Sequence, residues 1–196
     1  MSALSAPFGL RVPRHYSGRI YATDLRLTKA LSEATPTMFQ GTPVSIDTTG
    51  RLALAANGAD FIGSFAGVEY TDLATGRPTV TSAWINGTLV KDQGGDSARF
   101  YFYRDPDLIY EIQVTDGAKA YADIGAQINF DANIAAGNTT TLYSIAGAAG
   151  LQAAGVQGML RIIDIARYVD NDWTDAFPIL QVQVARHQDV ALKVGY

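Results

Sequence analysis

Metal ligands are the first chemistry to look for, and the chain offers few of them. It contains no cysteine and two histidines, His15 and His187. A centre using both imidazoles would need the N-terminal segment to fold back onto the end of the chain, which no helical or strand spacing favours. Residues 170–175 are similar to a calcium loop, but Asp175 stands where that loop needs glycine and Gln181 where it needs glutamate. We expect a capped turn there, and no metal or cofactor.

Paired carboxylates are the second candidate chemistry. Asp105 and Asp107 flank Pro106, and Glu111 follows them. Two acids at a suitable separation could hydrolyse a glycoside, but aspartates around a proline are more typical of turns, because they hydrogen-bond their own backbone. No Gly-x-Ser-x-Gly elbow, Walker loop or dinucleotide fingerprint occurs in the sequence. We therefore expect no catalytic residues and no enzymatic activity.

Exposed aromatic side chains could bind sugars instead. Trp84 and Trp173 could each stack on a sugar ring, although a tryptophan in a strand is more often part of the core. A glycan-binding β-sandwich therefore stays open as an alternative function.

The elements that must position these residues are short strands separated by turns. Residues 98–103 and 108–114 are two aromatic and aliphatic strands that meet at the corner 105–107, where Pro106 cannot join a sheet ladder. In the second strand one face is apolar, while Glu111 and Gln113 are on the other, which we expect to meet water or a partner. Further strands are predicted at 21–27, 43–46, 52–55, 61–70, 80–85, 141–145, 159–165 and 179–185.

This pattern predicts an all-β fold, an antiparallel β-sandwich or β-barrel-like domain. Turn signals recur between the strands, at 47–50 and 73–78 for example, and residues 92–96 form a polar loop. Residues 131–158 are rich in Ala and Gly, and we expect one helical turn at 151–154.

Composition limits the partners. The chain has 196 residues, is 47% hydrophobic, and carries a net charge of −4. An acidic chain is a poor general binder of nucleic acid or anionic membranes, so we expect neither as a partner. Because no stretch has the pattern of a signal peptide or a membrane span, we expect synthesis in the cytoplasm.

The first nineteen residues differ from the rest. Residues 1–19 contain basic side chains and no acid, are interrupted by two prolines, and show no periodicity. We interpret them as an extended N-terminal arm, followed by a β-rich domain at 20–196. The alternatives are a frayed terminus and an anchor whose apolar residues enter a neighbour's groove while its basic residues meet carboxylates. The candidate partner-binding residues are Phe8, Leu10, Arg11, Val12, Arg14, His15 and Arg19.

A series of short phrases spans nearly the whole chain. They are Phe8-Gly9-Leu10-Arg11 with Arg14-His15, the stretch 63–72 with Gly76-Arg77-Pro78, Trp84 with Gly87-Thr88, Asp105-Pro106-Asp107 with 110–113, Asp123-Ile124-Gly125, and 160–163. Together they resemble the head decoration, or cement, proteins of tailed bacteriophages. The order Val12-Pro13 departs from the Pro-Val that we associate with that family after Leu-Arg.

The resemblance implies a structural protein of the virion. Such proteins are all-β domains on the outer surface of an icosahedral capsid, often trimers at threefold and quasi-threefold positions, where they clamp neighbouring major capsid protein subunits. It implies no catalytic residues. Another virion component, in the tail or a fibre, is the nearest alternative.

Overall fold

The computed structural model describes residues 4–15, 17, 28–29, 36–48, 50–91 and 98–190. Within them the chain forms β-strands and a single 3₁₀ turn at Tyr121–Asp123, without any α-helix. The prediction of an all-β fold is confirmed. Among these residues no helix is long and apolar enough to cross a membrane.

The strands are short and numerous. The first nine are β1 (Arg11–His15), β2 (Thr28–Lys29), β3 (Met38–Phe39), β4 (Pro43–Ile46), β5 (Leu52–Leu54), β6 (Gly63–Thr71), β7 (Pro78–Thr81), β8 (Ala83–Trp84) and β9 (Ala98–Phe102). The others are β10 (Leu108–Gln113), β11 (Gln127–Phe130), β12 (Gly137–Asn138), β13 (Tyr143–Ser144), β14 (Ala148–Leu151), β15 (Leu160–Ile165) and β16 (Ile179–Val184).

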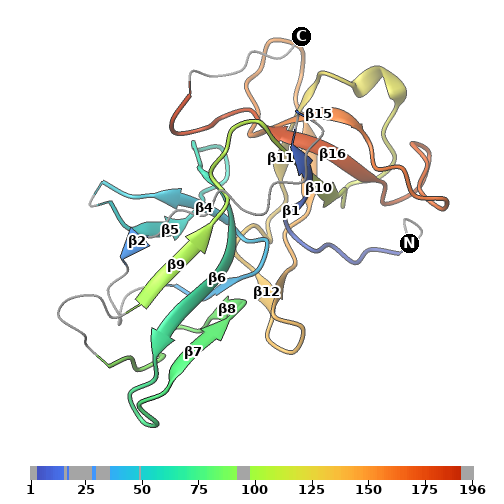
Figure 1. The fold of residues 1–196 in the computed structure, drawn as a ribbon. Coiled ribbons are helices and arrows are strands. Elements are labelled where there is room, and N and C mark those ends of the chain that lie inside the picture. Colours follow the sequence, from blue (N-terminus) through green and yellow to red (C-terminus); the bar gives the residue numbers. More distant parts are fainter. Residues whose placement is uncertain are drawn as a thin grey trace.

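Two six-stranded antiparallel sheets organise the molecule (Figure 1). One has the order β1-β10-β16-β15-β11-β14, and the other runs β2-β9-β6-β4-β5, with β7 also paired to β6. We call them the arm sheet and the hairpin sheet. Strand β9 of the hairpin sheet leads into β10 of the arm sheet through the corner at Asp105–Asp107, so the predicted pair of strands connects the two sheets.

Each sheet has its own apolar core. In the core of the hairpin sheet, Trp84 of the neighbouring strand β8 is 1% exposed, and its ring lies 5.2 Å from that of Phe100 and 5.8 Å from that of Tyr70. In the arm sheet, residues of β10, β15 and β16 pack around Phe61 and Phe130, whose rings meet edge to face at 5.5 Å. Burial of these side chains is the main force that holds the sheets together.

The prediction that one face of β10 meets water or a partner is wrong. All six residues of β10 are buried, including Glu111 and Gln113. The N-terminal segment of the same chain covers these polar groups. Arg11 forms an ion pair with Glu111, and the Gln113 side chain donates to the Leu4 carbonyl at 2.9 Å and accepts from the Ala6 amide at 2.7 Å.

Other local predictions have mixed outcomes. The strands predicted at 43–46, 159–165 and 179–185 correspond closely to β4, β15 and β16. The helical turn predicted at 151–154 is wrong, because Leu151 is the last residue of β14, which pairs with β11. The alternating stretch 21–27 and the loop 92–96 lie outside the described residues.

Candidate partner-binding groove

The backbone of the N-terminal arm passes close to the backbone of another segment at Gly9 and Gly41. Gly9 donates to the carbonyl of Ala146 at 3.0 Å, and Leu10 donates to the carbonyl of Gly41 at 2.8 Å. Gly9 has a φ of +74°, and a Cβ added to it would lie 2.5 Å from the Gly41 oxygen. Only glycine fits such a close crossing in this backbone conformation, so the sequence fixes where the arm turns onto the sheet.

Some side chains of the arm pack into the core of its own chain, and others do not. We expected Leu10 to enter a neighbour's groove, but it is 1% exposed and belongs to the core of the arm sheet. Its side chain is therefore unavailable to a partner. Phe8 and Val12 are only half-buried, and both border an open cavity.

Arg11 is the electrostatic centre of the arm. Its guanidinium forms an ion pair with Glu111, which is 5% exposed, and donates a hydrogen bond of 2.5 Å to the Tyr168 hydroxyl. Tyr168 in turn donates to Glu111 at 2.6 Å. Burial and this carboxylate raise the pKa of Tyr168, so the hydroxyl keeps its proton. The Phe8 ring lies 4.8 Å from the guanidinium carbon, as in a cation–π contact.

The remaining predicted arm residues do not gather around that cavity. Arg14 donates to the side-chain oxygen of Gln181 at 2.6 Å, and His15 lies against Asp105. Arg19 is outside the described residues. The structure thus brings Phe8, Leu10, Arg11 and Val12 to one place and turns Arg14 and His15 elsewhere.

A first cavity of about 370 Å³ lies beside the arm. The arm contributes one wall, and the hairpin sheet and the turn before β4 contribute the others. Its lining residues are Phe8, Leu10, Arg11, Val12, Gln40, Gly41, Phe65, Tyr103 and Tyr143.

A second, more open cavity of about 490 Å³ continues over the outer face of the hairpin sheet. It shares Gln40 and Tyr103 with the first, so the two cavities are neighbours, and we call the pair the groove. The lining residues here are Gln40, Ala66, Gly67, Val68, Val80, Thr81, Ser82, Tyr101 and Tyr103. Val80 is 76% exposed at its margin.

The chemistry of the groove is apolar with a few hydroxyl donors. Burial raises the pKa of Tyr103. A hydrogen bond of 2.7 Å to Glu69 is the main cause that raises the pKa of Tyr101. Both phenols are therefore neutral at physiological pH. A surface of tyrosine, valine and phenylalanine with fixed hydrogen-bonding groups suits an extended protein segment, because aromatic side chains bury large areas at low entropic cost.

Other candidates from the sequence have structural roles. Trp84 is buried and cannot stack on a sugar, while Trp173 is half-buried and meets the edge of Tyr121 at 6.4 Å between ring centres. The stretch 170–175 is the capped turn we expected, with Asp172 accepting the Thr174 amide at 3.0 Å and Asp175 accepting the Asp172 amide at 2.7 Å.

Sequence reasoning missed Gln40, Tyr103 and Tyr143 as groove residues. Gln40 and Tyr143 are joined by an isolated bridge between segments about a hundred residues apart. No local pattern reports such a contact. Tyr103 ends the aromatic run 100–103, and that run was the available signal. No family model matches the chain, and neither a curated protein nor a solved structure is similar to it.

Proposed function

We propose that this protein decorates the outer surface of a tailed-phage capsid. It acts as a homotrimer at threefold and quasi-threefold positions, where each copy holds a segment of the major capsid protein in its groove. The observation that carries this proposal is the groove itself, whose walls include Phe8, Arg11 and Val12 of the arm. These residues belong to the phrase that begins the resemblance to decoration proteins, or follow it directly.

The groove favours a protein segment as the ligand. Its lining combines apolar side chains with tyrosine hydroxyls and backbone groups, which is the composition of a protein–protein interface core. Arg11 is already paired with Glu111, so the groove holds no uncompensated charge from that pair. We therefore expect the bound segment to be extended and mainly uncharged.

Exposed aliphatic residues add a second contact area near the hairpin of β6 and β7. Leu73, Val80 and Leu89 are 52%, 76% and 62% exposed. The amide of Leu73 donates to the carbonyl of Leu89 at 3.2 Å, which keeps these two residues together. Exposed aliphatic side chains held together, as Leu73 and Leu89 are, are typical of association sites.

Weak single contacts are sufficient for this function. If three grooves are joined in one trimer, the second and third contacts form at millimolar effective concentration, and the overall affinity exceeds that of one contact by roughly 10² or more. A ligand that binds only the closed shell then stabilises the shell by mass action.

The experiment is binding to phage heads that lack the decoration protein. Purified protein is mixed with heads of each maturation state and sedimented, and the bound copies are counted at saturation. We expect saturation at a fixed ratio to the capsid subunits, and that ratio identifies the symmetry positions that are filled. Failure to bind any maturation state would overturn the decoration function.

A matched pair of variants tests the groove. Val80→Glu places a carboxylate at the groove margin, whereas Val156→Glu places one in the loop between β14 and β15, at the other edge of the arm sheet from β1. Val156 is 48% exposed, so both changes are made on the surface. We expect Val80→Glu to weaken head binding about tenfold or more, since burying an unpaired charge costs several kcal/mol, and Val156→Glu to leave it unchanged. Equal binding by both variants would remove the groove from the mechanism.

A further inference from the structure

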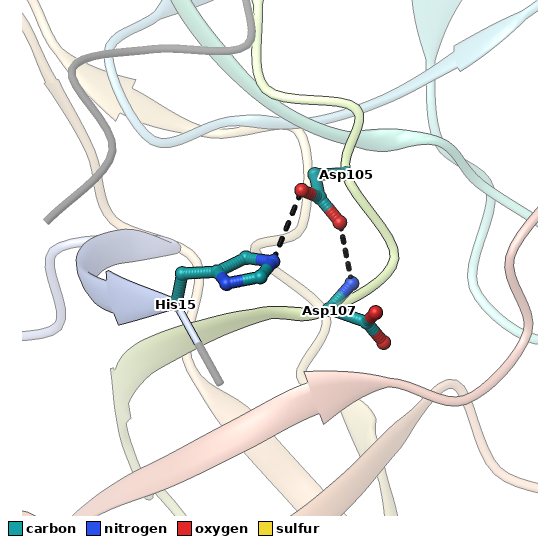
Figure 2. A group of neighbouring side chains, drawn as sticks. All are labelled: His15, Asp105 and Asp107. Atoms are coloured by element: carbon teal, nitrogen blue, oxygen red, sulfur yellow. Dashed lines mark hydrogen bonds and ion pairs between the residues drawn. The ribbon is translucent and has the colours of Figure 1, made fainter. Parts of the chain in front are cut away.

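Three potential metal ligands meet where the end of β1 approaches the corner between β9 and β10 (Figure 2). His15 Nε2 lies 3.1 Å from Asp105 Oδ2, and one donor atom from each of His15, Asp105 and Asp107 lies within 4.8 Å of the others. The side chains of His15 and Asp105 are only 13% and 22% exposed. The cluster is therefore partly shielded from water but open at Asp107.

The distance between His15 and Asp105 suits a small divalent ion. Ligand atoms about 2.1 Å from a tetrahedral zinc ion stand roughly 3.4 Å apart, close to the distance between the His15 and Asp105 donors. Figure 2 shows the Asp107 carboxylate turned outward, while its backbone amide bonds Asp105 Oδ1 at 2.8 Å. Asp107 is exposed, so its carboxylate can reach an ion by rotating about its own side-chain bonds.

Ser17 is the hydrogen-bond partner of His15 Nδ1, both without an ion and with one. The Ser17 amide donates to His15 Nδ1 at 3.1 Å, which leaves the proton of the neutral ring on Nε2, facing Asp105. When an ion binds at Nε2 the single ring proton moves to Nδ1, and Nδ1 then donates to Ser17 Oγ, 3.0 Å away, instead of accepting from the Ser17 amide. Metal-bound histidines usually have such a hydrogen-bond partner on the other nitrogen.

We propose that His15, Asp105 and Asp107 bind a divalent first-row transition-metal ion, with Zn²⁺ as the best match and water completing the coordination. Two carboxylates and a neutral imidazole balance the ion's charge. An imidazole ligand disfavours Ca²⁺ and Mg²⁺, which prefer oxygen donors. The bound ion fastens the arm to the corner that links the two sheets. This inference does not depend on the proposed function.

Isothermal titration of the full chain with Zn²⁺, after treatment with EDTA, tests the site. We expect one ion per chain and a higher melting temperature with Zn²⁺ than with EDTA. Ca²⁺ at the same concentration should give neither effect. No saturable binding of Zn²⁺, or equal binding of Ca²⁺, would overturn the proposal.

Variants then locate the ion. His15→Gln, Asp105→Asn and Asp107→Asn should each weaken Zn²⁺ binding about tenfold or more. Asp164→Asn is the matched control, because Asp164, like Asp105, accepts a nearby backbone amide through Oδ1. Asp107→Asn stays informative if the other variants melt early in EDTA, because no described hydrogen bond or ion pair uses the Asp107 carboxylate. Retention of full affinity in all three ligand variants would refute the assignment.

Discussion

The Tyr110 hydroxyl allows a sharp test of the energetics of this fold. Tyr110 is fully buried in β10, and its hydroxyl has no hydrogen-bond partner among the residues that the structure describes. A buried polar group without a partner costs about 1 to 3 kcal/mol. We therefore expect Tyr110→Phe to raise the free energy of unfolding at pH 7 by about 1 kcal/mol, the low end of that range, because the lost oxygen leaves a small gap.

Tyr110 also affects how the stability of the fold changes with pH in alkaline solution. Burial, reinforced by the charge of Asp105, raises the pKa of Tyr110 well above its ordinary value of about 10. Below pH 10 both the folded and unfolded states keep the proton, so the group has no effect on pH dependence. Above pH 10 the unfolded state loses the proton while the folded state keeps it, so stability falls by about 1.4 kcal/mol per pH unit.

Tyr110→Phe removes this loss. The difference in free energy of unfolding between the variant and the parent should increase from about 1 kcal/mol at pH 7 to about 2.4 kcal/mol at pH 11. Urea unfolding followed by tryptophan fluorescence at pH 7, 9, 10 and 11 measures it. Tyr121→Phe is the control, because Tyr121 is 75% exposed, and we expect it to leave stability at pH 7 unchanged. A less stable Tyr110→Phe variant at pH 7, or a gap that stays constant from pH 9 to 11, would contradict the reasoning.

Two further predictions concern the close contact of the arm at Gly9 and the loss of stability at acid pH. Gly9→Ala should destabilise the fold by about 2 to 4 kcal/mol, whereas Gly50→Ala, at a φ of +79° with nothing within 4 Å of the added Cβ, should cost about 1 kcal/mol. Equal losses in urea unfolding would show that crowding at the arm crossing is unimportant. The Arg104 hydrogen bond lowers the pKa of Asp189, so this carboxylate stabilises the fold above about pH 4 and its contribution disappears as the pH falls through the lower folded-state pKa. Asp189→Asn should therefore lower the free energy of unfolding at pH 6 by at most about 1 kcal/mol, because the Asp189 side chain is 37% exposed. Near pH 2 the variant and the parent should be equally stable. A difference in stability that persists at pH 2 would show that the charge of Asp189 is not its cause.

The sequence was informative wherever the evidence for a strand is local. Strands β4, β15 and β16 could be predicted because apolar side chains or their alternation mark them. The exposure of β10 could not be predicted, because Glu111 and Gln113 are polar and their cover comes from residues about a hundred positions away. A local pattern reports which residues share a face but not what lies against it.

The candidate site shows the same limit. The basic and apolar residues of the arm identified Phe8, Arg11 and Val12, which do line the groove. Tyr143 lies in a region that the sequence left almost unassigned, and its place in the groove depends on the bridge to Gln40. His15 was considered as a metal ligand only together with His187, and Asp105 only as one of the paired acids. The contact between His15 and Asp105 depends on the pairing of β1 with β10.

The position of β10 between β1 and β16 has a consequence for how the chain folds during synthesis. About 70 residues separate the end of β10 from the end of β16, so a ribosome takes roughly 4 to 14 s to deliver the second neighbour. Strand β1 has already left the ribosome when β10 emerges. By pairing first, it can close one edge of β10 against other nascent chains during that interval, when an unpaired strand is most prone to aggregate. The arm would then act as an internal chaperone for the strand beside it in the arm sheet.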